Sequence, residues 1–207
     1  MIPPARFVPI LEKYGIVTNL DKFIWESVCK WLRKWLDAGH AAVPVSVNVS
    51  QMDVYSVNVP DVFSGLLKKY DLPASLIKVE ITESAYAEDT AVVKDTVRRL
   101  REQGFLVLMD DFGSGYSSLN MLCLMPIDAL KIDMKFVRNV ASSGTGYRMV
   151  ELVIEMARAL GVPAIVEGVE DEAQYRLMKQ VGCDIIQGYY FSRPVDAKNF
   201  EPMILEK

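Results

Sequence analysis

Short apolar runs rich in β-branched residues alternate along the chain with longer stretches in which apolar residues recur at helical spacing. This alternation is typical of a parallel sheet whose strands are joined by crossover helices. The chain is therefore expected to have an α/β fold. The pattern predicts six strands, at Val43–Val49, Ile77–Thr82, Leu106–Asp110, Ala129–Ile132, Ala164–Val166 and Ile185–Tyr189.

Three stretches between the predicted strands have helical spacing and an apolar stripe that is expected to face the core. The first stripe consists of Leu20, Phe23, Ile24, Leu32, Trp35 and Leu36. The second stretch is Asp89–Gln103, with Val93, Val97, Leu100 and the helix-stopping Gly104. The third stripe consists of Met149, Leu152, Val153, Met156 and Leu160. A last helix and strand are predicted over Asp171–Gly182 and Cys183–Tyr189.

Repeating strand and helix units can close into a barrel or stay open as a doubly wound sheet. The GxGxxG fingerprint of a dinucleotide-binding open sheet is absent from the sequence, which favours the barrel. Six predicted strands are two fewer than a closed barrel of roughly eight strands needs. We therefore expect a TIM-like (β/α) barrel that is incomplete in this segment, folded as a single domain over residues 1–207.

The net charge of −4 gives no reason to expect long nucleic acid or an anionic membrane surface as a partner. Three widely spaced cysteines without a CxxC pair are typical of free thiols in a reducing compartment. Neither a signal peptide nor an apolar run of about 18 residues is found, so we expect a cytoplasmic location without a membrane segment in this piece. Any membrane anchor of the parent protein would lie outside it.

Polar and charged side chains recur where the predicted strands end, at the edge where barrels form their active sites. Period-two alternation places Glu80 on the strand face opposite to Val79 and Ile81, and burying this carboxylate unpaired would be costly. The set at the strand ends consists of Asn48, Glu80, Glu83, Asp110, Asp111, Lys131, Asp133, Glu167 and Gln187.

Carboxylates that converge on one edge repel one another unless protons, hydrogen bonds or cations offset their charge. Hard divalent ions such as Mg²⁺ and Mn²⁺ prefer oxygen ligands. The adjacent Asp110 and Asp111 suit a two-metal site, in which ions about 3.5–4 Å apart hold a phosphodiester and activate water. With His40 as the only histidine, neither a histidine metal site nor a histidine triad can be built. The pattern indicates phosphoester hydrolysis.

Six motifs in this order resemble those of the EAL family of cyclic-di-GMP phosphodiesterases. The resemblance extends over essentially the whole chain, and six ordered motifs are a specific signal. The motifs are VSVNVS at Val45–Ser50, VEITES at Val79–Ser84, DDFGSGYSSL at Asp110–Leu119, LKID at Leu130–Asp133, VEGVE at Val166–Glu170 and QGYYFSRP at Gln187–Pro194.

The resemblance implies an eight-stranded barrel that hydrolyses cyclic di-GMP to linear pGpG with two Mg²⁺ or Mn²⁺ ions. It makes Asn48, Glu80 and Asp110 ligands of one metal, with Asp110 bridging to a second that also engages Asp111 and Glu167. Lys131 resembles the family lysine that holds the attacking water. Residues that support the site or contact the substrate would be Gln187, Asp133, Glu170 and Arg193. The loop that couples the site to dimerisation would be formed by Glu83 and Phe112–Leu119, including Gly113, Ser114 and Gly115.

The sequence departs from the family pattern at its front. The segment Ile2–Val17 resembles the part that normally follows the EAL tripeptide, and the tripeptide itself is absent. The family glutamate that completes the first metal site would be missing with it, as would two strands. The sequence leaves three explanations open: a truncated piece, a missing part supplied by another chain, or a natural fragment with reduced activity.

Each candidate residue also has a structural alternative. Asp110 and Asp111 could cap a helix before a turn, and Asn48 could form an Asx turn with Ser50. Lys131 could pair with Asp128 or Asp133 in a structural salt bridge. A surface or capping role is open for Glu83, and Arg193 could contact phosphate or cap the barrel edge.

Two other functions are weighed against hydrolysis of cyclic di-GMP. The first is an EAL-like receptor that binds the nucleotide or a protein partner without catalysis. Such members usually have substitutions in DDFG, KID or EGVE, and all three are intact here. The second is another metal-dependent barrel enzyme, such as an enolase-type proton abstractor, which the six motifs disfavour. The family also leads us to expect a homodimer and leaves room for an upstream sensor or diguanylate cyclase domain.

Overall fold

The computed structural model describes residues 3–88, 90–113, 122, 125–133, 136–137 and 146–205. The chain forms two compact units, one of residues 1–109 and 118–128 and the other of residues 110–117 and 129–207. The boundary between the units passes through a strand. Across the described ranges, no helix combines the length and the apolar character that crossing a membrane requires.

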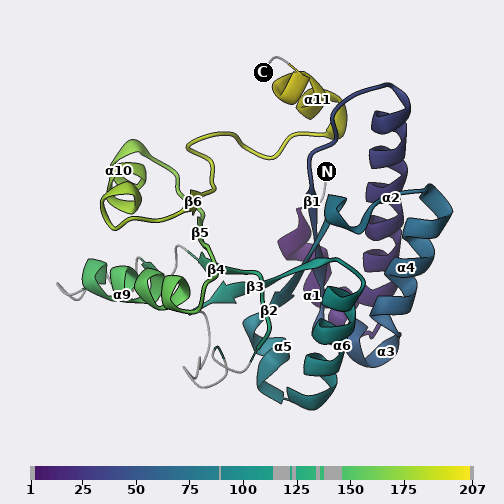
Figure 1. Cartoon of the computed structure of the whole chain (residues 1–207), viewed down its shortest axis with the longest axis horizontal. Helices are drawn as coiled ribbons and strands as arrows, with labels where there is room; N and C mark the ends of the chain where they lie inside the picture. Colours follow the sequence, from purple (N-terminus) through teal and green to yellow (C-terminus); the bar gives the residue numbers. More distant parts are fainter. Residues whose placement is uncertain are drawn as a thin grey trace. The chain divides into compact units, whose positions relative to one another are not determined.

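The first unit contains two parallel strands, covered by helices, and the beginning of a third strand. Strand β1 pairs with β2 in a register that places Val47 opposite Val79 and Asn48 opposite Glu80. Helix α2 packs against α4 and β1, and Figure 1 shows α2 and α4 side by side. The elements are α1 (Pro4–Lys13), α2 (Val17–Asp37), β1 (Val45–Val49), α3 (Gln51–Ser56), α4 (Val59–Tyr70), the 3₁₀ turn Ala74–Leu76, β2 (Ile77–Thr82), α5 (Glu83–Glu88), α6 (Thr90–Glu102) and β3 (Leu106–Phe112).

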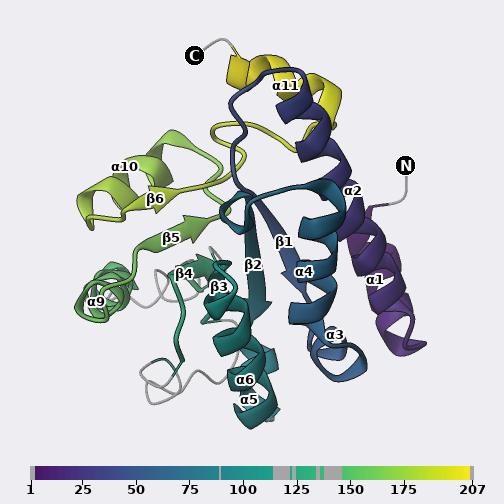
Figure 2. The same ribbon diagram turned by 45° about the vertical axis from the view of Figure 1, so that its right-hand side comes forward.

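The second unit contains the end of β3 and three further strands in the order β3-β4-β5-β6. The pairs β4–β5 and β5–β6 are both parallel. Figure 2 shows β5 and β6 side by side, with α10 next to β6. The elements after β3 are β4 (Ala129–Asp133), α9 (Gly146–Ala159), β5 (Ala164–Glu167), α10 (Glu172–Gln180), β6 (Ile185–Ile186) and α11 (Ala197–Leu205).

All six predicted strands are present, and β2 has the predicted bounds Ile77–Thr82, whereas the other strands differ from the prediction at one or both ends. Strand β1 begins at Val45 because Pro44 lacks the N–H group that a ladder needs. Strand β6 ends at Ile186 instead of Tyr189. Its continuation turns at Gly188, where an added Cβ would lie 2.1 Å from the carbonyl oxygen of Val169, so that only glycine allows the close approach.

Two of the three predicted helix stripes are confirmed only in part. In α2 the predicted Leu32 and Trp35 are buried together with Trp25 and Cys29, which the prediction lacked, whereas Phe23 and Ile24 are exposed. In α9 the predicted Val153 is buried, but Met149, Leu152 and Leu160 are exposed. Both helices have apolar residues on more than one face, so periodicity alone could not choose the face. The stripe of α6 is confirmed: Val93, Val97 and Leu100 are fully buried and Gly104 has a φ of +89°.

Two carboxyl groups meet where α2 approaches α3. Asp53 is fully buried, and its Oδ2 accepts hydrogen bonds from the backbone N–H (2.8 Å) and the hydroxyl (2.7 Å) of Ser50. Burial, the charge of Asp53 and a hydrogen bond to Asp53 raise the pKa of Asp21 to about 7, and Glu12 of α1 adds a smaller effect in the same direction. Two adjacent carboxyl groups are most stable when they share one proton.

This pair predicts a pH dependence of stability. Because the pKa of Asp21 is higher in the folded state, the native protein binds more protons between pH 3.8 and about 7, and stability is lost as the pH rises through that window. Asp21→Asn should donate a hydrogen bond to Asp53 at every pH and have a higher Tm than the unmodified chain above about pH 7. Thermal unfolding across the window measures this difference.

The matched control is Asp37→Asn, which removes an exposed carboxylate of the same helix that pairs with Arg33. The control should keep the pH slope of the unmodified chain. An unchanged slope in Asp21→Asn would contradict the shared proton.

Candidate active site

A buried lysine lies between two carboxylates on neighbouring strands. The Nζ of Lys131 in β4 is 3.0 Å from Asp110 Oδ1 in β3 and 2.8 Å from Glu167 Oε1 in β5. The side chains of Lys131, Asp110 and Glu167 are 5%, 13% and 22% exposed. The structure therefore brings together three of the residues that the sequence analysis singled out.

The strand register explains why these groups meet. Lys131 pairs with Ile165 and Asp133 with Glu167, so the four side chains lie on one face of the β4–β5 pair. Asp133 is half-buried at the carboxyl end of its strand. An ammonium group buried to this degree is costly unless opposite charges replace its water. The pairing with Asp110 and Glu167 thus stabilises both the charge and the alignment of the three strand ends.

The backbone is constrained where β3 ends, from Asp111 to Gly113. The backbone of Asp111 has a φ of +58°, a left-handed conformation that aspartate tolerates better than most residues, and its N–H donates to Asp110 Oδ1 at 2.9 Å. Phe112 is buried. Gly113 has a φ of +91°, and an added Cβ would lie 2.5 Å from the ring of Phe136. The predicted loop residues Ser114 and Gly115 lie outside the described residues.

In the first unit, Asn48 and Glu80 face each other across β1 and β2. Glu80 is 9% exposed although it lies on the strand face opposite to the buried Val79 and Ile81, whereas Asn48 is exposed. Ser50 is engaged by Asp53 in a capping box at the start of α3. An amide side chain and a buried carboxylate are therefore held side by side at the ends of two parallel strands.

Glu83 is the first residue of α5 and is 3% exposed, so the alternative of a surface carboxylate is wrong. A carboxylate in the first turn of a helix is favoured by the helix dipole. Glu170 is exposed, and its backbone N–H donates to the side chain of Gln174 at 2.8 Å.

Gln187 is held beside the end of β5 by its backbone. Its N–H donates to the carbonyl of Val166 at 2.8 Å, and its carbonyl accepts from the N–H of Val169 at 3.1 Å. The side chain of Gln187 belongs to an exposed residue. The Arg193 guanidinium lies 4.9 Å from the ring centroid of Tyr189, a cation–π contact that neither of its two predicted roles had anticipated.

The oxygen donors of Asp110 and Glu167 are the groups of this site that a divalent cation would bind. In the described part of the chain, no group of three or more His, Cys, Asp or Glu side chains is arranged to hold a metal ion. The chemistry of Asp110 and Glu167 nevertheless suits Mg²⁺ or Mn²⁺, because both supply carboxylate oxygens. Two carboxylates against one ammonium also leave an excess of negative charge among the three groups.

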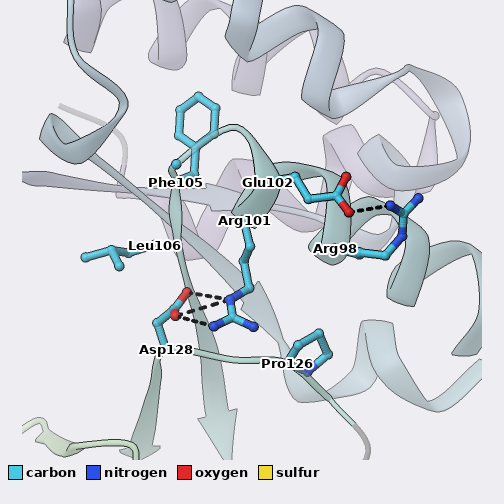
Figure 3. A pocket seen from close by; sticks show the side chains of 8 residues that line it. Arg98, Arg101, Glu102, Phe105, Leu106, Pro126 and Asp128 are labelled. Carbon is cyan, nitrogen blue, oxygen red and sulfur yellow. Dashed lines mark hydrogen bonds and ion pairs between the residues drawn. The ribbon is translucent and has the colours of Figure 1, made fainter.

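Asp128, which the sequence analysis offered as a structural partner of Lys131, has other partners in the first unit. Asp128 accepts hydrogen bonds from Arg101 at 2.9 and 3.2 Å and from the backbone N–H of Val107 at 2.8 Å. Figure 3 shows Arg101 and Asp128 facing each other in a surface hollow. In the same hollow Arg98 faces Glu102. Because both arginines are paired with carboxylates, this hollow at the start of β3 is a structural contact and not a second site.

The sequence analysis missed the Asp21–Asp53 pair and a hydrogen bond of Trp25. The S-x-x-D spacing of Ser50 and Asp53 is a helix-start signal that could have identified the capping box. The indole N–H of Trp25 donates to the backbone carbonyl of Asn48 at 2.9 Å. No sequence pattern indicates such a contact between residues 23 positions apart.

A comparison with protein families matches residues 1–194 to the EAL domain. The chain belongs to the EAL domain family. The resemblance of the six motifs is thereby confirmed. The two groups of polar residues described above are the motif residues of this EAL domain.

The sequence similarity of this chain to three other bacterial proteins supports the same family. The chain is 35% identical over 205 residues to the signaling protein YkoW of Bacillus subtilis, covering 99% of this chain and 26% of the relative. It is 32% identical over 198 residues to the bifunctional diguanylate cyclase/cyclic di-GMP phosphodiesterase MucR of Pseudomonas aeruginosa, covering 96% and 29%. It is 33% identical over 202 residues to the cyclic di-GMP phosphodiesterase RocR of the same species, covering 97% and 51%. The chain thus spans between about a quarter and a half of these relatives.

Solved structures confirm the predicted fold class, a TIM-like α/β fold of the EAL type. The MucR phosphodiesterase in complex with c-di-GMP matches with a TM-score of 0.89 and 32% identity, over 96% of this chain and 81% of that chain. The EAL domain of Mycobacterium smegmatis DcpA matches with a TM-score of 0.82 and 29% identity, over 92% and 86%.

The Arg101–Asp128 contact predicts a measurable contribution to stability. Asp128→Asn removes the charge that pairs with Arg101 and weakens the acceptor for the Val107 N–H, so the free energy of unfolding should fall by about 1–2 kcal/mol. Asp95→Asn, which breaks the exposed pair with Arg98, should change it by less than about 0.5 kcal/mol. Urea unfolding of both variants measures the difference, and equal losses would contradict a special role for Asp128.

The pairing of Lys131 predicts a charge-dependent loss of stability. Lys131→Met leaves Asp110 and Glu167 facing each other without a cation and should lower the free energy of unfolding at neutral pH by roughly 3 kcal/mol. Acidic pH should restore much of the loss, because protonation of one carboxyl group relieves the repulsion. Unfolding at neutral and acidic pH measures both effects. A loss that is the same at both pH values would indicate a packing defect instead.

Proposed function

We propose that this EAL domain hydrolyses cyclic di-GMP to linear pGpG with two divalent cations, Mg²⁺ or Mn²⁺, as cofactors. Two relatives at 32–33% identity are named as cyclic di-GMP phosphodiesterases, and the MucR structure that resembles this chain is a complex with c-di-GMP. The observation that carries the proposal is the buried contact of Lys131 with Asp110 and Glu167. This contact places an ammonium group, which donates hydrogen bonds, beside two carboxylate oxygens of the neighbouring strands.

The residues that would hold the cations are the oxygen donors of the motifs. In the second unit these are Asp110, Asp111 and Glu167, and the family motifs give Asn48 and Glu80 the same role in the first unit. When bound, such cations neutralise the charge of the phosphodiester and lower the pKa of a bound water.

The side chains of the chain itself would position the water. Lys131, as the ammonium group that its two ion pairs require, has three N–H donors and no lone pair, so it orients the attacking water and does not deprotonate it. A carboxylate beside it, Asp110 or Glu167, then accepts the proton. The water oxygen forms a bond to phosphorus, the bond from phosphorus to the 3′ oxygen breaks, and that oxygen takes up a proton.

Other predicted residues would act around this centre. Gln187, Asp133, Glu170 and Arg193 would support the site or contact the nucleotide. Glu83, Phe112 and Gly113, together with Ser114 and Gly115 outside the described residues, would belong to the regulatory loop. We further propose a cytoplasmic single domain over residues 1–207 that forms a homodimer, in a parent protein with room for an upstream sensor or diguanylate cyclase domain.

A second candidate function is a cyclic-di-GMP receptor without catalysis. It is favoured by one observation: within the ranges that the structure describes, the carboxylates do not form a group of three or more arranged around a metal position. The family fold would still present a nucleotide site in that case, and binding would occur without cleavage.

Product formation separates the two candidates. The chain incubated with cyclic di-GMP and Mn²⁺ should form pGpG, and Glu167→Gln should lower the rate by about 100-fold or more, the size expected when a positioned catalytic group is lost. Glu155→Gln, which alters an exposed carboxylate of α9, should leave the rate unchanged. Chromatography of the nucleotides measures all three rates.

Binding of cyclic di-GMP without product, both in this chain and in a form of the gene extended upstream, would overturn the phosphodiesterase proposal and support the receptor. If only the extended form yields pGpG, the activity belongs to the EAL domain, and residues 1–207 alone are not sufficient for it.

A further inference from the structure

One buried side chain in α2 contacts the strand end that carries Asn48. Trp25 is 1% exposed, and its indole N–H donates to the backbone carbonyl of Asn48 at 2.9 Å. The indole has a single polar hydrogen, so this bond uses the whole donor capacity of the side chain. The contact joins the helix to the one strand residue that supplies a predicted oxygen ligand in β1.

The position of Trp25 is fixed by aromatic packing. Its ring lies 4.8 Å from that of Phe63 in α4, and Phe63 lies 5.5 Å from Phe105, which is also buried. Tilted rings at these separations are in favourable contact and have little rotational freedom in a close-packed core. A donor held in this way can in turn fix the carbonyl that it binds.

The strand end needs such support because β1 stands at one end of the strand order. It is paired with β2, where Asn48 lies opposite Glu80. Two residues after Asn48, Ser50 begins α3 and is held by Asp53. The backbone at Asn48 is therefore fixed on three sides: by β2, by the capping box and by Trp25.

We propose that Trp25 is a positioning residue for the metal ligand Asn48. By fixing the backbone carbonyl of Asn48, the indole limits the directions from which the amide oxygen of the exposed side chain can approach a cation next to Glu80. This inference rests on the proposed function, because it assumes that Asn48 binds a divalent cation. In this arrangement, a hydrogen bond from a group that does not contact the metal orients an oxygen ligand of the metal.

The same helix provides a matched control. Trp35 is 2% exposed, and within the described part of the chain its buried indole nitrogen has no hydrogen-bond partner. Trp25→Phe and Trp35→Phe therefore remove similar volumes from the same helix, but only the first removes a hydrogen bond to the strand. The difference between the two variants isolates the contact from the loss of packing.

Titration with Mn²⁺ alone, followed by calorimetry, tests the inference without relying on activity. Trp25→Phe should bind Mn²⁺ roughly tenfold more weakly than the unmodified chain, the size expected for loss of an outer hydrogen bond to a metal ligand. Trp35→Phe should retain the affinity of the unmodified chain even if its Tm is lower. Equal affinities in the two variants would overturn the positioning role.

Hydrogen exchange distinguishes failure of this inference from failure of the proposed function. Amide hydrogens of Val45–Val49 and Ser50 should exchange faster in Trp25→Phe than in Trp35→Phe, relative to those of β2, whether or not a metal binds. If the unmodified chain binds no Mn²⁺ but this difference is seen, the metal proposal fails while the positioning of Asn48 stands. Identical exchange at β1 in the two variants would contradict the positioning of Asn48 itself.

Discussion

The constraint on which the site depends is the burial of one positive charge in a parallel sheet. The ammonium group of Lys131 is almost fully enclosed, and the carboxylates of Asp110 and Glu167 on the adjacent strands balance its charge. Because the paired groups lie on neighbouring strands, their pairing also stabilises the register of β4 against β5. The same strand ends hold an excess of negative charge, which favours a cation beside them.

In the first unit, polar side chains are also held at strand ends, but other kinds of contact hold them. Glu80 is buried next to an exposed Asn48, and the strand that carries Asn48 is supported by an indole donor and a capping box. In the same unit, burial and the neighbouring charge of Asp53 raise the pKa of Asp21 to about 7. In both units the groups with proposed functions lie at strand ends. The buried Lys131 is balanced by carboxylates of the neighbouring strands, whereas the backbone of Asn48 is supported from α2 and α3.

The sequence predicted the elements and residues whose signals are local. The six strands, the buried face of α6 and the position of Glu80 follow from periodicity, and the motifs identified the family. Contacts between distant residues were not predictable: the donor from Trp25 depends on how α2 packs, and the buried face of α2 is decided by Phe63 in another helix. The short β6 depends on the close approach of Gly188 to Val169, which no strand propensity reflects.

The most direct test of the account is a crystal structure of the chain saturated with Mn²⁺, with the metal located by anomalous scattering. The account predicts manganese bound to carboxylate oxygens of Asp110 and Glu167, with the Lys131 ammonium group still within hydrogen-bond distance of at least one of them. Manganese absent from both carboxylates, with Lys131 still bridging them, would contradict it. The lysine contact would then be a structural ion pair, and the domain would act by binding alone.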